Sequence, residues 1–331
     1  MSVQTPDRSV APAHGSTSRG RRLVDLLLLR YGMVWVLVLV AVVARQAYPG
    51  FFGPTNLRIL LSQMTPITII ALGSTFVIIA GCFDLSVGAI FALSGVIYGV
   101  MADSVGLWPG FWITLVAGAI AGIVNGVLVT VFKINTFIAT LGSSSLFVGL
   151  AYALSTEGQV SPDNPDFGEL GSVQWGGIWA VSYLLVVLVV VSAIVLHSTT
   201  FGQSVFAVGG NAEAARLAGK RVGLVIVGTY IISGVCAALA GMIVASQSGV
   251  GAASISGTIA LDAITIVIVG GTSLLGGEGA IWRTLVGAFI IAIISNVLGS
   301  LGVTNTAQLI VKGTVLILAV TLDSFTRGRR V

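Results

Sequence analysis

The segment FGQSVFAVGGNAEAARLAGKR (Phe201–Arg221) is a short polar stretch between two long apolar ones. Asn211 is a residue type that caps helix N-termini, and Glu213 falls in the first turn, where the helix dipole favours an anion. Gly219 is a typical helix stop, and two basic residues follow it at the cationic end. We therefore predict a short capped helix on a loop between membrane spans, suited to binding another protein.

The composition of the whole chain is that of an integral membrane protein. Of its 331 residues, 56% are hydrophobic and only 8% are charged, against about 25% charged in soluble domains. Such a chain cannot cover itself with a wettable surface. The 43 glycines are about twice the usual share, which in membranes indicates helices in close backbone contact. Cys82 and Cys236 lie at or within apolar segments, which predicts two small buried residues without redox or metal chemistry.

A search with a window of about 20 apolar residues finds ten candidate membrane spans. They cover residues 31–48, 57–80, 85–102, 109–131, 135–155, 178–197, 222–245, 260–275, 281–300 and 306–324. We expect an all-α integral membrane protein of about ten transmembrane helices. Its membrane domain would be residues 31–324, preceded by a cytoplasmic tail and interfacial segment, 1–30, and followed by a cytoplasmic tail, 325–331.

The basic residues predict the orientation of these spans. If the N-terminus is cytoplasmic, thirteen of the sixteen lysines and arginines fall in cytoplasmic segments. Arg45 and Arg58 then face outward, and Lys312 lies within the last span. The longest outward loop, 156–177, contains acidic residues and no basic one. The positive-inside rule therefore predicts that both termini are cytoplasmic. The net charge of +4 reflects this topology and requires no nucleic-acid partner.

Two glycine-rich polar turns, which we name the first elbow (79–88) and the second elbow (270–279), interrupt the apolar pattern. Their glycines permit sharp turns, and their polar side chains can satisfy backbone groups freed at helix ends. They are either tight turns with a capping residue or broken helices that line a path or touch a partner. With three polar residues of the spans, they provide our candidates for a translocation path, namely Asp84, Ser86, Asn125, Asp262, Thr272, Ser273 and Asn296.

The polar residues of the spans could instead have structural roles that do not involve a translocation path. Asn125 and Asn296 could bond to a neighbouring helix, and Asp262 could be the N-terminal acid of a helix. Weak similarity between residues 118–136 and 287–306, which run in opposite directions in the predicted topology, suggests an inverted repeat, with chance similarity as the alternative. The glycine stripe at 118, 122 and 126 predicts close helix packing.

Several motifs are missing from the sequence. It contains no Gly-x-x-x-x-Gly-Lys-Ser/Thr loop to cradle phosphate, so we do not expect the chain to hydrolyse ATP. Its two histidines offer no metal site or catalytic triad. No relay of charged residues runs through the predicted spans, which argues against a proton-driven carrier. A docking helix without an internal motor points to an external motor.

The motifs of the elbows and of the polar loop resemble those of a known family. They are ALGSTFVIIAG (71–81), DLSVG (84–88), NGVLVT (125–130), FIATLG (137–142), FAVGGN (206–211), EAAR (213–216) and GGTSLLGG (270–277). Over roughly residues 55–323, the chain resembles the inner-membrane permease subunits of ribose/xylose/arabinose-type ABC importers. It departs from their pattern at Cys82-Phe83, at Asn135-Thr136 and at Ala212, where a proline is frequent, and these departures leave the cargo open.

The resemblance implies a permease subunit, not an enzyme, that moves a monosaccharide across the bacterial cytoplasmic (inner) membrane by alternating access. It implies ATPase subunits that carry ATP and Mg²⁺, an extracytoplasmic sugar-binding protein and a second permease copy, expected as a homodimer, with no cofactor on this chain. The coupling helix seated in the ATPase would contain Gly210, Asn211, Glu213, Ala214, Ala215, Arg216 and Gly219. Alternatives are the same machinery with a nucleoside, a furanose signal or a polyol as cargo, a self-powered secondary carrier, and a membrane scaffold.

Overall fold

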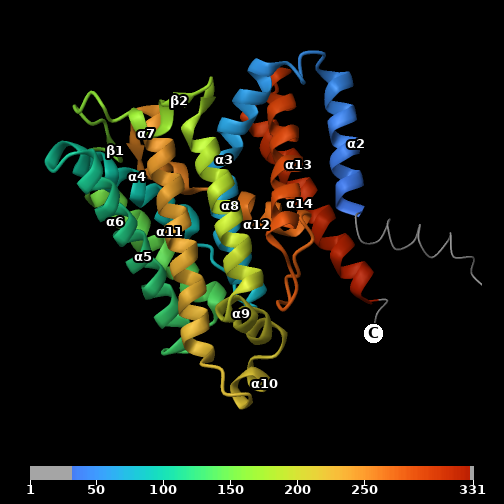
Figure 1. Ribbon diagram of the computed structural model, residues 1–331. Coiled ribbons are helices and arrows are strands. Elements are labelled where there is room, and N and C mark those ends of the chain that lie inside the picture. The colour runs from blue at the N-terminus through green and yellow to red at the C-terminus, as the bar shows by residue number, and fades with distance from the viewer. Residues whose placement is uncertain (1–31, 329–331) are drawn as a thin grey trace, which may run out of the picture.

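Seven helices of the computed structural model, which describes residues 32–328, are long and apolar enough to cross a membrane (Figure 1). They are α3 (Pro54–Ile79), α4 (Val87–Ser104), α5 (Leu107–Thr130), α6 (Thr136–Ala153), α8 (Ala180–Ser198), α11 (Val222–Ser248) and α13 (Ile281–Ser300). Three shorter apolar helices are α2 (Gly32–Ala47), α12 (Ile259–Val269) and the first part of α14 (Asn305–Gly328). Each predicted span overlaps one of these helices, whereas the predicted tail 1–30 lies outside the described residues.

The eighth predicted span, 260–275, is too long. Its helix, α12, ends at Val269 after 11 residues, and the chain then turns through the second elbow. The turn is made at Gly271, whose φ of +82° is a conformation that side-chain-bearing residues rarely adopt. At about 1.5 Å per residue, α12 is roughly half the length needed to cross a bilayer. It is therefore a half-helix within the bundle.

The two ends of the bundle carry different polar elements. At one end, α9 (Thr200–Gly210) leads into α10 (Ala212–Leu217), and at the other lie α7 (Glu169–Ser172) and the short strands (Figure 1). These strands are β1 (Gln159–Val160), β2 (Gln174–Trp175), β3 (Ile178–Trp179) and β4 (Gly251–Ala252), followed by the 3-10 helix η1 (Ala253–Ser256). The chain is mostly helical, in agreement with the all-α expectation, and its few strand residues form two antiparallel pairs, β1 with β4 and β2 with β3. The first pair ties the predicted outward loop to the end of α11.

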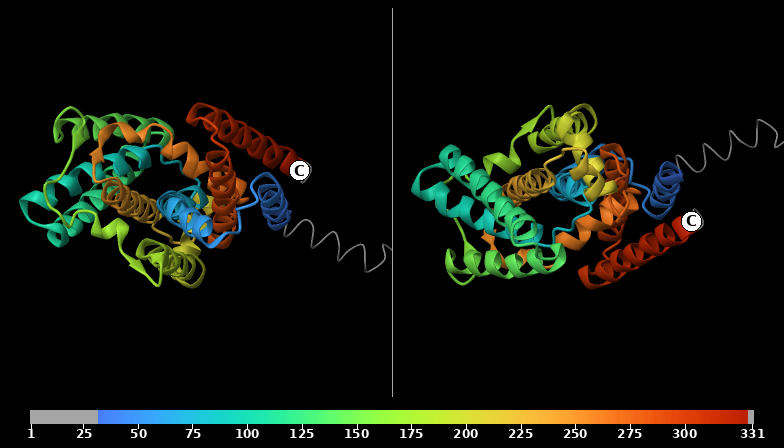
Figure 2. Two further views of the ribbon diagram at one scale, coloured as in Figure 1. Left: turned by 90° about the horizontal axis from the view of Figure 1, so that it is seen from above. Right: turned by 90° about the horizontal axis from the view of Figure 1, so that it is seen from below.

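Helix α11 lies at the centre of the bundle and packs on α3, α4 and α5 (Figure 2). The predicted glycine stripe is confirmed as its contact with α5. A Cβ atom at Gly122 would overlap the carbonyl oxygen of Tyr230, and one at Gly126 would lie 2.8 Å from the Cα of Val227. Only glycine permits so close an approach of the two backbones. In contrast, large apolar side chains such as Val116 and Ile120 on the outer face of α5 are exposed, as a lipid-facing surface requires.

Candidate functional site

Helix α10 is the capped helix that the polar loop predicts. Asn211 is its N-cap, and its side-chain oxygen accepts a hydrogen bond from the backbone N–H of Ala214 at 2.9 Å. Glu213 and Arg216 form an exposed ion pair at 2.6 Å. The hydrogen bond and positive charge of Arg216 lower the pKa of Glu213, so this carboxylate is ionised at neutral pH. The helix ends before Gly219, whose φ is +81°.

Most of the predicted coupling residues are exposed at the tip of the loop. Among Gly210, Asn211, Glu213, Ala214, Ala215, Arg216 and Gly219, only Ala215 is buried. Leu217, which follows Arg216, is a large apolar residue, yet 78% of its surface is exposed. An exposed leucine beside a charged pair is suited to a protein partner. Sequence reasoning missed Leu217, because the helical face that a leucine occupies is known only once the helix is placed.

Behind α10, the C-terminal end of α9 touches both elbows at one point, which we name the glycine junction (Ile79, Gly81, Gly209, Gly276 and Gly277). The N–H of Gly277 donates a hydrogen bond to the carbonyl of Ile79 at 2.8 Å. A Cβ atom at Gly209 would overlap that same carbonyl, and one at Gly276 would lie 2.8 Å from the Cα of Gly81. Backbone packs directly on backbone here. A displacement of α9 therefore reaches α3 and the second elbow without passing through soft side chains.

The first elbow is held by a buried polar network. Asp84 accepts three hydrogen bonds, from the backbone N–H of Ser86 at 3.0 Å, from its hydroxyl at 2.6 Å and from the Ser233 hydroxyl at 2.8 Å. The side-chain amide of Asn125 donates to the Ser86 hydroxyl at 2.6 Å. The network joins the start of α4 to α5 and α11, and Asp84, Ser86 and Asn125 are all buried. These three candidate path residues therefore occupy a packed interface between helices.

Thr272 and Ser273 of the second elbow are also buried, as is Asn296. The Ser273 hydroxyl accepts a hydrogen bond from the N–H of Leu275, as a turn-stabilising side chain does, whereas the Thr272 hydroxyl makes no hydrogen bond to the described residues. Asn296 on α13 forms a reciprocal amide pair with Asn56 on α3, at 3.1 and 3.2 Å. This is the interhelical bonding that the sequence left as the alternative to cargo contact.

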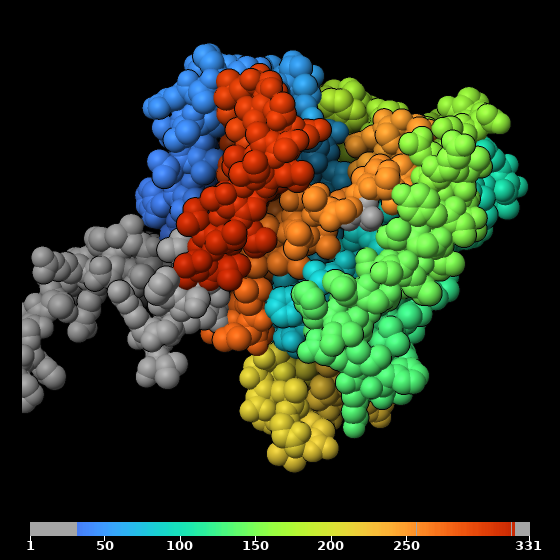
Figure 3. Space-filling view, turned by 180° about the vertical axis from the view of Figure 1, so that it is seen from behind, coloured from blue at the N-terminus to red at the C-terminus, as the bar shows by residue number. Residues whose placement is uncertain are grey.

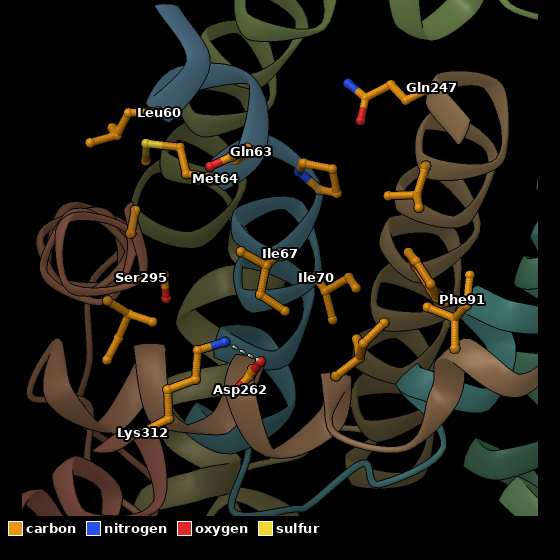
Figure 4. Close-up of a pocket in the computed structure, with 16 residues that line it drawn as sticks. Leu60, Gln63, Met64, Ile67, Ile70, Phe91, Gln247, Asp262, Ser295 and Lys312 are labelled. Atoms are coloured by element: carbon orange, nitrogen blue, oxygen red, sulfur yellow. Dashed lines mark hydrogen bonds and ion pairs between the residues drawn. The ribbon is translucent and has the colours of Figure 1, made fainter. Parts of the chain in front are cut away.

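A cavity of about 400 Å³ lies among α3, α11, α12, α13 and α14. In the space-filling view, the surface is hollowed beside the orange α12 segment, with blue atoms of α3 visible behind it (Figure 3). Figure 4 shows the lining side chains, most of which are apolar. The polar lining residues are Gln63, Gln247, Asp262, Ser295 and Lys312. Of the seven candidate path residues, Asp262 lines this cavity and the other six do not.

Asp262 lies in the first turn of the half-helix α12, and its carboxylate pairs with Lys312 of α14 at 3.0 Å (Figure 4). The two side chains are 18% and 23% exposed, respectively. Sequence reasoning placed Lys312 inside the last span without connecting it to Asp262. The available signal was a lone lysine in an apolar helix, which requires a partner within the membrane.

A bundle of apolar helices with an exposed polar helix at one end and a cavity among its helices is the architecture of an integral membrane protein and agrees with a transport role. Residues 56–320 match the family described as branched-chain amino acid transport system / permease component. The chain is 37% identical to the ribose import permease protein RbsC of Bacillus subtilis over 93% of its length and 96% of the relative's. It is 34% identical to the L-arabinose ABC transporter permease protein AraH of Azospirillum brasilense, over 98% of this chain and 95% of the relative. The ribose import permease protein RbsC of Escherichia coli K12 is 35% identical, over 93% of this chain and 98% of the relative.

The chain therefore belongs to this family of ABC transporter permeases, which includes ribose and arabinose permeases. The relatives are membrane transport components and not enzymes, in agreement with the resemblance found in the motifs. No solved structure matches the chain.

Proposed function

We propose that this chain is the membrane-spanning permease subunit of an ABC importer that carries a monosaccharide, a pentose or hexose, into the bacterial cytoplasm. Separate ATPase subunits would bind ATP and Mg²⁺, an extracytoplasmic binding protein would deliver the sugar, and a second copy of the chain would complete the pathway. The observation that carries the proposal is the exposed, capped α10, connected through the glycine junction to the helices around the cavity. The relatives named for ribose and arabinose support a sugar as cargo.

The connection suggests how ATP hydrolysis is coupled to transport. The ATPase would grip α10 at its exposed face, including Glu213, Arg216 and Leu217. Its closure would displace α9, and the glycine junction would pass that displacement to α3 and to the second elbow between α12 and α13. Since these three helices line the cavity, its shape would change as the ATPase closes and reopens. Alternating access follows from that rearrangement.

Transport and coupled ATP hydrolysis by the reconstituted importer test this proposal. We expect the double substitution Asn211→Lys and Glu213→Lys to abolish both, because it removes the cap and reverses the charge at the start of α10. Gln174→Lys, which introduces a lysine at an exposed position in the opposite loop, is the control and leaves coupled hydrolysis intact. Membrane insertion is verified for each variant, and unchanged transport by the double variant would overturn the assignment.

Two further measurements test the alternative transport mechanism, a secondary carrier, and the alternative cargoes. The purified chain alone, given an ion gradient, should take up no pentose, and uptake under those conditions would identify a secondary carrier. A thermal-shift screen of the partner binding protein against pentoses, hexoses, nucleosides and polyols identifies the cargo. Stabilisation by a nucleoside or polyol alone would keep the importer and replace the sugar.

A further inference from the structure

We propose that the Asp262–Lys312 pair is the polar floor of the cargo cavity and selects electrically neutral, polyhydroxylated solutes over charged ones. The inference rests on the proposed function and assigns residues of this chain to cargo recognition. The starting observation is the position of the pair. It joins the first turn of a half-helix to α14 at the base of the cavity (Figure 4), and ionisable groups at membrane depth are retained chiefly for function.

Both charged groups have hydrogen-bonding capacity to spare. A carboxylate can accept about four hydrogen bonds and an ammonium can donate three. Among the side chains that the structure describes, the hydrogen bond of either group is the 3.0 Å bond that they share. Both side chains are partly exposed and both line the cavity. The pair therefore offers adjacent acceptors and donors, which match a hydroxyl group because a hydroxyl both donates and accepts.

The rest of the wall suits the same class of solute. The side chains of Gln63 and Ser295 make no hydrogen bond to the described side chains or backbone, so an amide and a hydroxyl are available beside the pair. Phe91, Met64 and Ile67 provide apolar surface against which the C–H faces of a sugar ring can pack. At about 400 Å³, the cavity is near the lower limit for small-molecule sites, as expected for a monosaccharide.

Selection for neutral solutes follows from the charges. Asp262 and Lys312 are the charged residues among those that line the cavity, and their charges cancel. A sugar acid or an amino sugar would lose hydration on entering and would find its counter-ion already paired. A neutral sugar loses less hydration and exchanges its water hydrogen bonds for those of the wall.

The simpler role for the pair is to tie α14 to α12. A matched control separates the two roles, because the Asn56–Asn296 amide pair also joins two helices, α3 and α13, but does not line the cavity. If the Asp262–Lys312 pair is only a tether, its loss should resemble the loss of Asn296. If it contacts cargo, the charge that remains should change which solutes bind.

The experiment measures weak binding by saturation-transfer NMR on the full-length chain in lipid nanodiscs. The ligands are L-arabinose, the corresponding aldonate and the corresponding amino sugar. We expect the unsubstituted chain to prefer the neutral sugar. Asp262→Asn removes the counter-charge of the lysine and should raise the ratio of aldonate to arabinose binding by about tenfold. Lys312→Met removes the counter-charge of the aspartate and should raise the ratio of amino sugar to arabinose binding similarly. The exchange of both residues, Asp262→Lys with Lys312→Asp, restores the pair and should restore the preference for arabinose.

Selectivity ratios that stay the same in all three variants, or that shift equally in Asn296→Ala, would overturn the inference. ATP-dependent arabinose uptake through the complete importer is measured with the same proteins. Unchanged ratios together with uptake that still requires α10 would reject the cargo floor and retain the permease function. Uptake that is independent of the ATPase would reject the permease function itself.

Discussion

The helix bundle contains two polar regions, the first elbow with its glycine junction and the cavity floor, and they are built in opposite ways. At the elbow, Asp84 accepts three hydrogen bonds from neutral donors, and the neighbouring backbones leave no space for a methyl group. At the floor, the carboxylate of Asp262 has one partner among the described side chains, the cation of Lys312, and faces open volume. An acidic residue within a membrane protein can thus be structural or available to cargo. A carboxylate that can accept further hydrogen bonds and that faces open space belongs to the second kind.

The largest effect should come from filling the glycine junction. Gly209→Ala places a Cβ atom onto the carbonyl oxygen of Ile79, and because backbone cannot move aside cheaply, we expect a loss of about 3 kcal/mol or more in stability. Gly210→Ala is the control, since its Cβ atom would meet no heavy atom within 4 Å. Thermal unfolding of the detergent-solubilised proteins measures both. Equal melting temperatures would show that the junction is looser than its geometry indicates.

The next effect tests whether the first elbow needs a charge. Asp84→Ala leaves the buried hydroxyls of Ser86 and Ser233 without their acceptor, which should cost about 2–3 kcal/mol. Asp84→Asn should cost less, because the amide oxygen still accepts from Ser86 and the Ser233 hydroxyl can rotate to accept from the amide nitrogen. Chemical unfolding of the two variants provides the comparison. If asparagine were as damaging as alanine, the carboxylate charge would be required, and the contrast with Asp262 would fail.

A smaller loss is expected at the amide pair between α3 and α13. Asn296→Ala removes two hydrogen bonds, but Asn56 keeps its bond to the carbonyl of Phe51 at 2.8 Å. We expect a cost of about 1 kcal/mol, typical of a polar contact between membrane helices. The melting temperature should fall slightly while arabinose uptake persists. Abolished uptake with an unchanged melting temperature would place Asn296 on the pathway, as the sequence first suggested.

The smallest effect on stability should come from the exposed pair on α10. Glu213→Gln removes the ion pair with Arg216, but solvent screens such pairs and their contribution is small. We expect no measurable change in melting temperature and weaker coupled ATP hydrolysis. A marked loss of stability would mean that α10 is part of the folded core and would contradict its role as a docking element.

The elements of the fold could be predicted because they depend on local chemistry. Apolar runs of sufficient length produced the spans, and Asn211 identified the start of α10 because an N-cap acts on a backbone N–H three residues away. The candidate span at 260–275 ran six residues past the end of α12 and overlapped the second elbow, because the helix end depends on the backbone conformation of Gly271. Local composition does not reveal where such a glycine is forced to turn.

The sequence by itself determined that this chain is an integral membrane protein with a capped helix on a polar loop, because hydropathy and capping are properties of single segments, and its motifs carried the resemblance to ABC permeases. Only the tertiary structure decided the use of each polar residue. Asp84, Ser86 and Asn125 meet in a packed interface, whereas Asp262 meets Lys312, fifty positions away, at the base of a cavity. The physical reason is that hydrogen-bond saturation and open volume depend on which helices become neighbours, and hydropathy does not specify helix neighbours in a membrane.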